Sequence, residues 1–524
     1  MGGATFGHAV AKAGYSVLFC ERGASSLGGD ALRGTYPEML AGRKGRSQNN
    51  LRTTLRSAGR CSDSIVDVSR AKPRSFVPFI GSGTGGSSAL YGMAFERMFP
   101  ADLAPRQNHP SARASNLPEN WPISYAELAR YYIMAEKLYG VHGTQDPLRS
   151  DSEFGYVAGP PDFSVVAREL AESLQRKGLH PYHLPLACEY VQSCAGCQGY
   201  LCASNCKHDG ATACLVPALA EYDASLLTGC DVLRLESTER RVTAVLAQWQ
   251  GRECRLRGKT VVLAAGALFT PVLLLRSASS EKPAGLANES GLVGRNLMRH
   301  NVDLYAVFTG AHPARSENAK ELALNDFYPT KECKLGSIQS FGAMLPARML
   351  VENMEHDLRH DGVAGLGAVF GLAKPLLGIV LDRLFSRSVV LATIMEDLPY
   401  LDNRVQVSSD PGDDGSCNIA YRMSQYDAGR IARFRQHMKR ILRPYRYLLI
   451  KQAENNQRLA HACGTCRFGL DPRESVLDRN NKAHGLDNLY VVDASFFPSS
   501  GGTNPALTIA ANALRVAAHF VDSA

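Results

Sequence analysis

The chain has 524 residues, of which 45% are hydrophobic and 21% are charged. This composition excludes a disordered, collagenous or coiled-coil protein, and the length predicts two to four domains with a large core. Basic residues exceed acidic ones by only 8, which does not indicate a nucleic-acid partner. Fourteen cysteines are too few for a disulfide scaffold, so we expect free thiols and a cytoplasmic location.

The N-terminal segment resembles the second half of a βαβ unit. Residues 4–13 predict a helix with small side chains on one face, and residues 16–20 predict a buried strand that ends at Glu21. In a dinucleotide-binding unit, the helix N-terminus holds a pyrophosphate and the acidic residue binds ribose hydroxyls. Gly3 would be the last glycine of the fingerprint. The first strand is missing from the sequence, as expected for a late-assigned start or a truncated chain, and any α/β protein with a glycine at a helix start would give the same pattern.

Glycines cluster between an apolar run over 76–80 and a helix predicted over 89–98. The central sequence is Gly85-Gly86-Ser87-Ser88. Glycine lets the backbone approach a ligand closely, and serine hydroxyls suit an anion. This pattern favours a loop that binds an anion or a flat cofactor over a flexible linker.

Several further elements are predicted along the chain. Ser124 and Glu127 form a capping box at the start of a helix that Gly140 ends. The others are a strand over 261–267 that turns into a helix over 270–277, a basic surface helix over 427–455, a strand over 488–493 and a helix over 503–520.

The longest apolar stretch, Val363 to Phe385, is interrupted by Lys374-Pro375 and by Asp382-Arg383. Such interruptions are poorly tolerated in a transmembrane helix. We therefore expect a buried or membrane-touching hairpin here and no transmembrane segment.

Four cysteines, Cys194, Cys197, Cys202 and Cys206, lie within 13 residues. Four thiolates so close in sequence could bind zinc or an iron–sulfur cluster. The spacing matches neither a zinc ribbon nor a standard ferredoxin motif. A thiol-rich structural loop, with or without one disulfide, stays open as the alternative.

Three sequence blocks, taken in their order along the chain, carry a resemblance to a known family. They read GGSSALYGM (85–93); AAGALFTP (264–271) with GLVGRNL (291–297); and HACGTCRFG (461–469) with DAS (493–495) and NPALT (504–508). Together they resemble the glucose–methanol–choline (GMC) family of FAD-dependent alcohol oxidoreductases. Asn403-Arg404-Val405 and the pairing of a His with an Asn look closest to the branch of gluconate and other sugar dehydrogenases and pyranose oxidases.

The resemblance implies an α/β plus α+β fold. An FAD-binding, doubly wound domain would be interleaved with a substrate domain built on an antiparallel sheet, and the first strand of the FAD domain would be missing. The expected division gives residues 1–100, 214–300 and 459–524 to the FAD domain. Residues 101–213 would form a cap or substrate segment with the cysteine-rich loop, and residues 301–458 the substrate domain.

The resemblance also implies contacts with FAD. Gly3 and Glu21 would serve its ADP part, and Val232 would meet the adenine. Gly266 and the loop formed by Gly85, Gly86, Ser87, Ser88 and Tyr91 would lie near the flavin. Contacts to the flavin or to its ribityl and phosphate chain would come from Asp493, Ala494, Asn504 and Thr508.

The chain departs from the family pattern at two positions. Tyr91 stands where the family usually has Asn, so one contact beside the flavin should differ. Some members link FAD covalently through a His in this loop, and Leu90 stands at that position, so we expect noncovalent FAD.

The resemblance also bears on the four cysteines over 194–206. Some sugar dehydrogenases of the family carry an iron–sulfur cluster in a cysteine-rich insertion at about the same place in the chain. A cluster at these cysteines would favour a dehydrogenase that passes electrons onward.

Alcohol oxidation needs a base for the hydroxyl proton and an acceptor for the hydride, and no side chain accepts hydride. By resemblance, the flavin is the acceptor and His461 is the base; a His has a pKa near ~6.5, which suits proton transfer at neutral pH. Asn504 stands at the second catalytic position, where its amide could donate to the developing alkoxide. The alternative role of His461 is that of a buried structural histidine, and the alternative role of Asn504 is that of a helix N-cap. We expect His300 and His484 to be structural.

The sequence thus predicts an FAD-dependent enzyme that oxidises a CH–OH group of a sugar, polyol or related alcohol. The electron acceptor stays open among oxygen, a quinone and a redox protein. One alternative is a long-chain or sterol alcohol oxidase, because of the apolar stretch. Another is an inactive flavoprotein-like chain, because of the missing strand, and a non-redox lyase of the same family is not excluded.

Overall fold

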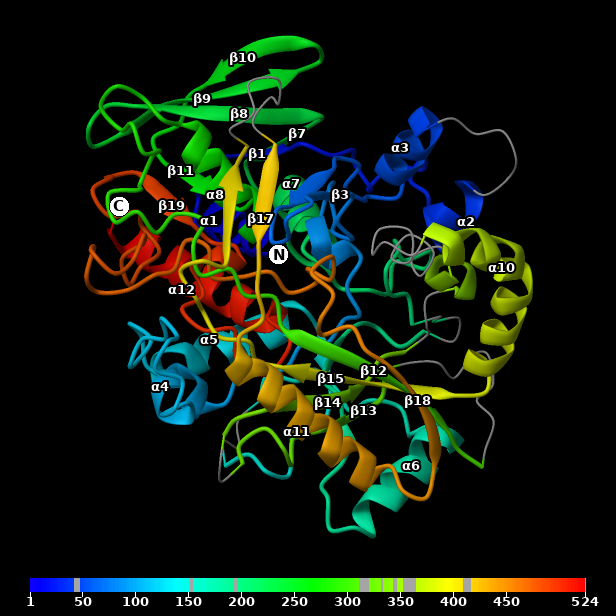
Figure 1. The fold of residues 1–524 in the computed structure, drawn as a ribbon. Helices are drawn as coiled ribbons and strands as arrows, with labels where there is room; N and C mark the ends of the chain where they lie inside the picture. Colours follow the sequence, from blue (N-terminus) through cyan, green and yellow to red (C-terminus); the bar gives the residue numbers. More distant parts are fainter. Residues whose placement is uncertain are drawn as a thin grey trace.

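The computed structural model describes residues 1–41, 48–150, 154–191, 194, 196–310, 320–330, 333–342, 346–351, 364–408 and 416–523. Helices and sheets are mixed, and segments far apart in sequence lie side by side (Figure 1). Two regions matter for the site: an α/β region that contains both chain ends, and a region built on an antiparallel sheet.

The α/β region is assembled from three separate stretches of chain. Strand β1 (Val17–Glu21) pairs in parallel with β7 (Ala224–Thr228), and β11 (Val261–Leu263) pairs in parallel with β19 (Leu489–Val491). These pairings confirm the strands expected at 16–20, 261–267 and 488–493. Parallel strands need long crossover connections, so the chain leaves this region and returns to it twice.

Helices cover these parallel strands. They are α1 (Gly2–Lys12), α5 (Tyr125–Leu138), α8 (Gly266–Arg276) and α12 (Ala506–Ser523). Apolar side chains of α1 and α12 pack together with Tyr490 and Val492. Ser124 caps α5, because its Oγ accepts a hydrogen bond from the backbone N–H of Glu127 at 3.1 Å. The Glu127 side chain completes no capping box and pairs with Arg479 at 2.8 Å.

The second region is a six-stranded antiparallel sheet in the order β18-β12-β15-β14-β13-β5. The strands are β5 (Tyr182–His183), β12 (Asn301–Phe308), β13 (Leu322–Leu324), β14 (Gly336–Ser340), β15 (Val389–Met395) and β18 (Arg446–Ile450). Helices α6 (Val165–Gln175) and α11 (Gln425–Ile441) lie beside the sheet (Figure 1), and their apolar side chains pack against one of its faces. Because side chains alternate along a strand, every second residue of β14 points to the opposite face, where the site lies.

The remaining strands form smaller sheets. The sheet elements are β8 (Cys230–Ser237), β9 (Val242–Trp249) and β10 (Arg252–Leu256) in one antiparallel sheet, β16 (Arg404–Val407), β17 (Cys417–Ala420), β2 (Ile65–Asp67) and β3 (Arg74–Phe76) in another, and the pair β4 (Val141–His142) and β6 (Leu186–Ala187). The helices are α2 (Pro37–Ala41), α3 (Gln48–Ser57), α4 (Pro105–Asn108), α7 (Val216–Glu221) and α10 (Ala364–Phe385).

Two helix predictions were wrong because tertiary pairing overrides local composition. The stretch 89–98 is not helical beyond the 3-10 turn at Gly86–Ala89. Met93 has φ of 61°, which a right-handed helix does not accommodate, and Ala94 bridges to Leu186 instead. The helix expected over 427–455 ends at Ile441, shortly before a proline that lacks the N–H a helix requires, and the chain continues as β18.

The hairpin expected over 363–385 was also wrong. Residues Ala364–Phe385 form the single helix α10, which runs through Pro375. Residue 363 lies outside the described residues. Of the helices in the described ranges, none combines the length and the apolar character that crossing a membrane requires.

Candidate active site

The start of α1 lies against the strands of the α/β region. A Cβ atom on Gly3 would come within 2.6 Å of the Cβ of Ala264, which follows β11, and one on Gly2 would overlap the carbonyl of Val492. Small residues are therefore required where α1 begins. This packing brings Gly3 and the turn before Gly266 together.

The glycine-rich loop meets the end of β1. A Cβ on Gly23 would overlap the backbone of Ser82 and Gly83. The Glu21 carboxylate accepts a hydrogen bond from the N–H of Gly23 at 2.7 Å, and burial raises the pKa of Glu21. The structure thus places the acidic residue and the loop, about 60 positions apart in the sequence, beside one another.

Gly86 and Gly266 share a second property. Both have left-handed backbones, with φ of 56° and 83°, and a Cβ on either would meet no atom within 4 Å. Their backbones therefore face open space. Such positions suit the close approach of a flat ligand.

Other predicted loop residues bind the protein backbone. Ser88 Oγ donates to the carbonyl of Gly85 at 2.6 Å and accepts from the N–H of Gly210 at 3.0 Å. Ser87 Oγ accepts from the N–H of Gly81 at 3.1 Å, and the Tyr91 hydroxyl donates to the carbonyl of His208. These side chains hold the shape of the loop and attach it to the cysteine-rich segment.

The C-terminal motif residues connect β11, β19 and α12. Asp493 accepts from the N–H of Gly266 at 2.9 Å and from the Thr270 hydroxyl at 2.5 Å through Oδ2, and from Ser495 through Oδ1. The carbonyl of Ala494 accepts from Gly464 at 3.1 Å. Thr508 Oγ1 lies 2.9 Å from the Tyr132 hydroxyl, and Val232 lies in β8 against the main hydrophobic core. Asp493 therefore clamps the β11–α8 turn.

His461 is held by a directed chain of hydrogen bonds. The fully buried His300 ring donates from Nε2 to the carbonyls of Ser500 at 3.0 Å and Gly501 at 3.1 Å. Burial lowers the pKa of His300, so its ring is neutral and Nδ1 is an acceptor. His461 Nδ1 therefore donates to His300 Nδ1 at 2.9 Å.

This direction leaves the lone pair of His461 on Nε2. Burial, and secondarily the charges of His300 and Lys320, hold the pKa of His461 well below 6.5, so the ring is unprotonated at neutral pH. His461 Nε2 makes no hydrogen bond to any described residue. The ring is thus an oriented base with a free acceptor atom.

Asn504 is oriented by a side chain from the antiparallel sheet. Gln339 on β14 donates from Nε2 to Asn504 Oδ1 at 2.7 Å. Because the amide oxygen is occupied, the Asn504 NH2 group is left to donate. Within the described part of the chain, that group has no hydrogen-bond acceptor.

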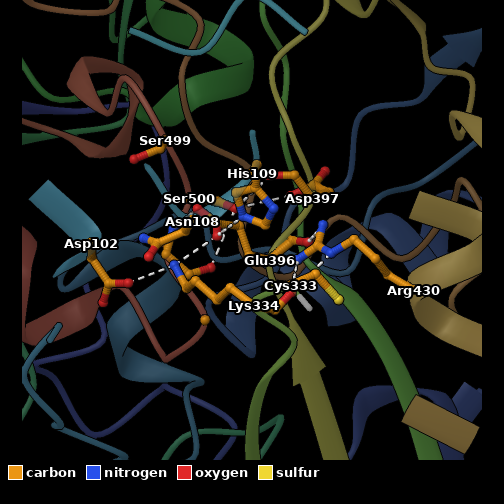
Figure 2. Close-up of polar contacts among 12 residues, drawn as sticks. Asp102, Asn108, His109, Cys333, Lys334, Glu396, Asp397, Arg430, Ser499 and Ser500 are labelled. Carbon is orange, nitrogen blue, oxygen red and sulfur yellow. Dashed lines mark hydrogen bonds and ion pairs between the residues drawn. The ribbon is translucent and has the colours of Figure 1, made fainter. Parts of the chain in front are cut away.

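A buried ion network joins Lys334 to the carboxylates of Asp102 and Glu396, and Figure 2 shows it together with Ser499 and Ser500. Lys334 Nζ lies 2.5 Å from Asp102 Oδ1 and 2.6 Å from Glu396 Oε2. The other Glu396 oxygen accepts from the N–H of Gly501 at 3.2 Å. Burial opposes ionisation of Glu396, but the charge of Lys334 and the hydrogen bond to His109 hold the pKa of Glu396 below its usual range. The hydrogen bond from Gly501 to Glu396 thus attaches the 499–504 loop to the network.

Two models of one family match the chain. Both are described as GMC oxidoreductase, and they cover residues 157–302 and 399–513. The chain is 31% identical over 463 residues to a 6'''-hydroxyparomomycin C oxidase from Streptomyces lividus, covering 84% of this chain and 78% of that one. It is also 31% identical over 459 residues to a paromamine 6'-oxidase from Streptomyces fradiae, again covering 84% and 78%.

The chain belongs to the GMC oxidoreductase family. It is therefore an FAD-dependent enzyme that acts on CH–OH groups, as the sequence predicted. The fold agrees: a pyridoxine 4-oxidase from Mesorbium loti superposes with a TM-score of 0.64 at 21% identity, covering 99% of this chain and 97% of that one.

The residues of this GMC oxidoreductase fit the FAD that its family binds. The open backbones of Gly86 and Gly266 form a cradle that a Cβ would fill. Glu21, half-buried at the end of β1, has the chemistry to accept hydrogen bonds from ribose hydroxyls.

The cysteine segment packs against the same loop. Gly199 donates to the carbonyl of Leu90 at 2.7 Å. Cys206 Sγ lies 3.6 Å from Cys202 Sγ and 3.7 Å from Cys194 Sγ. All fourteen cysteines are free thiols. Within the described ranges, no group of three or more His, Cys, Asp or Glu side chains is arranged to hold a metal ion.

Sequence reasoning did not find how the two proposed catalytic residues are held. His300, which we expected to be structural, contacts His461 directly. Gln339 was not singled out at all. Its only signal was a polar residue within a short, otherwise strand-like segment, 165 positions from Asn504.

Proposed function

We propose that this chain oxidises a carbinol of a sugar, polyol or related alcohol, with His461 as the base and Asn504 as a hydrogen-bond donor. The observation that carries the proposal is the directed contact from His461 through His300 to the 500–501 carbonyls. It presents an unprotonated Nε2 at neutral pH. A buried histidine with a purely structural role would have both ring nitrogens engaged.

The reaction needs one proton to move to a stated atom. His461 Nε2 accepts the hydroxyl proton of the substrate, while its Nδ1–H remains bonded to His300 and keeps the ring in place. The Asn504 NH2 group donates to the substrate oxygen as negative charge develops there. FAD, when bound, supplies the acceptor for the hydride from the carbinol carbon.

We further propose the FAD contacts and the domain division expected from the sequence. Gly3, Glu21 and Val232 would serve the ADP part, and the 85–91 loop, Gly266, Asp493, Ala494 and Thr508 the rest. Leu90 has no nucleophilic atom, which supports noncovalent binding. Acid precipitation of the holoenzyme should leave the flavin in the supernatant; flavin in the pellet would contradict noncovalent binding.

The function is tested by the visible spectrum of the purified holoenzyme, recorded anaerobically. Two resolved flavin bands that bleach on addition of a sugar or polyol are the expected result. Flavin bands that no alcohol bleaches would contradict the proposal. A folded, colourless protein would favour the inactive flavoprotein-like chain.

The same spectrum tests the iron–sulfur proposal for Cys194, Cys197, Cys202 and Cys206. That proposal is supported by the closeness of the four cysteines in the sequence and by the contacts of Cys206 with Cys202 and Cys194, and we derive no step through a cluster. A broad absorbance beneath the flavin bands, lost on treatment with an iron chelator and acid, is the result expected of a cluster. Its absence would assign the segment a structural role. We propose a cytoplasmic location because the free thiols suit a reducing compartment; cell fractionation tests it.

A second candidate function, oxidation of long-chain or sterol alcohols, has one observation in its favour. Helix α10 exposes Leu376, Ile379 and Val380, which are 68%, 59% and 52% exposed, and it lies at the periphery of the molecule (Figure 1). Such a surface suits contact with a lipid. Cosedimentation with phosphatidylcholine liposomes, together with flavin bleaching by a long-chain alcohol, would favour this candidate over sugar oxidation.

Gln339→Met should lower the rate of flavin reduction about 10-fold, because Asn504 would lose the hydrogen bond that orients it. FAD content and the unfolding temperature should stay near those of the unmodified protein. The matched control is Ile338→Val. Ile338 lies on the same strand as Gln339, but its side chain packs on the face that α11 covers. Equal reduction rates for Gln339→Met and the control would show that Asn504 does not depend on Gln339.

A further inference from the structure

Lys320 is a buried cation beside the candidate active site. Its side chain is 9% exposed, and it makes no hydrogen bond or ion pair with any described residue; its one aromatic partner is the Phe341 ring, whose centroid is 5.9 Å from Nζ. Buried lysines are nearly always paired. A lysine that no described group neutralises therefore points to a ligand of opposite charge.

The surroundings of Lys320 also contain a polar atom without a partner. A Cβ on Gly92 would overlap both Lys320 Nζ and Gln198 Oε1, so these two atoms flank the same glycine just after Tyr91. Gln198 Oε1 is buried and has no hydrogen-bond partner. Buried polar atoms are rarely left unpaired. Their cluster indicates that a polar molecule completes the site.

The position of Lys320 relative to the catalytic pair follows from β14. Phe341, which contacts Lys320, directly follows β14 and continues its pairing, because its N–H donates to the carbonyl of Val390 on β15 at 2.7 Å. Gln339, which contacts Asn504, is two positions earlier and therefore points to the same face. Two residues along a strand span roughly 7 Å. Gln339 Oε1 and the Ser337 hydroxyl on this face are also buried without partners. The charge of Lys320 also reaches His461, whose pKa it lowers.

We propose that Lys320 binds the carboxylate of a sugar acid whose reacting carbinol, several carbons away, lies at His461 and Asn504. The inference rests on the proposed function and adds the substrate class. The ammonium group would form a charge-assisted hydrogen bond with the carboxylate, and Gln198 is placed to bind a neighbouring hydroxyl. The buried site makes this pair stronger than one at the surface.

The test compares matched substrates with the FAD-loaded enzyme under anaerobic conditions. D-gluconate and D-glucuronate carry the carboxylate, D-glucitol and methyl glucoside lack it, and D-glucosamine carries a positive charge instead. Stopped-flow absorbance gives the apparent dissociation constant and the limiting rate of flavin reduction. We expect the carboxylates to bind about 10- to 100-fold more tightly than the neutral analogues, the range of a charge-assisted hydrogen bond.

Variants separate the charge of Lys320 from its volume. Lys320→Met should abolish the preference for carboxylates, so that D-gluconate binds no more tightly than D-glucitol. Lys320→Arg should keep most of the preference. Lys451→Met, which removes an exposed lysine, is the matched control and should change neither value. FAD content and unfolding temperature show whether each variant is folded. If Lys320→Met does not fold, the comparison of substrates and the Lys320→Arg variant test the proposal.

Acid–base titration adds an independent readout. Burial, and secondarily the charge of Lys207, lower the pKa of Lys320 to about 8. His461, a further titratable neighbour, stays neutral above pH 7 because its pKa is depressed. The preference for carboxylates should therefore weaken as the pH rises from 7 to 9.

The outcomes distinguish this proposal from the proposed function. If no alcohol reduces the flavin, the proposed function itself fails. The carboxylate site is overturned if neutral and anionic alcohols bind equally well. It is also overturned if Lys320→Met lowers only the reaction of the reduced enzyme with oxygen. In both cases the proposed oxidation of an alcohol is unaffected. Tighter binding of D-glucosamine than of D-gluconate would overturn it as well.

Discussion

His461→Ala should lower the limiting rate of flavin reduction by about 10² to 10⁴, the range that general-base catalysis contributes. His461 presents the only oriented, unprotonated imidazole nitrogen that we find in the described site, since His300 has both ring nitrogens engaged. Binding of substrate should change far less than the rate. Single-turnover reduction of the FAD-loaded variant by an excess of alcohol measures the effect directly.

The pH dependence of the unmodified enzyme provides the companion measurement. Because the pKa of His461 lies well below 6.5, the reduction rate should be level above pH 7 and fall only in acid, as the ring becomes protonated. The Ala variant should lose this acid limb. His484→Ala, which removes a histidine bonded to Ser475, is the control and should keep the rate. An unchanged rate in His461→Ala would show that His461 is not the base.

Lys334→Met should destabilise the protein by about 3–5 kcal/mol, because it leaves the carboxylates of Asp102 and Glu396 buried without their cation. Lys334 is 3% exposed, and both acidic partners are 1% exposed or less. Hydrogen bonds from Tyr328 and Gly501 also converge on these carboxylates. Urea unfolding followed by tryptophan fluorescence and circular dichroism measures the loss.

The control and a double variant show whether unpaired charge is the cause. Lys439→Met removes an exposed lysine from α11 and should change stability by less than about 0.5 kcal/mol. Adding Glu396→Gln to Lys334→Met removes one stranded charge and should recover part of the loss. A Lys334→Met variant as stable as the control would show that the network contributes little to folding.

The sign of the pH effect follows from the same network. Folding lowers the pKa of Glu396 and raises that of Lys334. The stabilisation from Glu396 is present above its ordinary pKa of 4.5 and is lost as the pH falls below it. The stabilisation from Lys334 is present below 10.5 and is lost at higher pH. At neutral pH both contributions are therefore complete.

Much of the α/β region could be predicted from the sequence, because its signals are local. Apolar, β-branched runs predicted β1, β11 and β19, and Ser124 predicted the start of α5. These patterns reflect backbone preferences and hydrogen bonds within a few residues. The motifs around Gly85, His461 and Asn504 indicated the family for the same reason, since each is a short run of chemically constrained residues.

Errors arose where distant segments compete with local preference. Residues 89–98 have helical composition, but Met93 has a left-handed backbone and Ala94 bridges to Leu186. The polar and Pro-containing interruptions of the apolar stretch suggested a hairpin, yet α10 continues through Pro375. Local composition predicts what a segment can form, whereas pairing with the rest of the chain selects among these conformations.

The sequence by itself determined the family, the FAD-dependent chemistry and the two residue types proposed for catalysis. Only the tertiary structure decided how those residues are oriented. His300 lies 161 positions from His461, and Gln339 lies 165 positions from Asn504, so no local pattern could connect them. The direction of a hydrogen bond and the burial of a charge depend on all the segments that close around a site, and for Lys320 and Lys334 they exist only once the chain is folded.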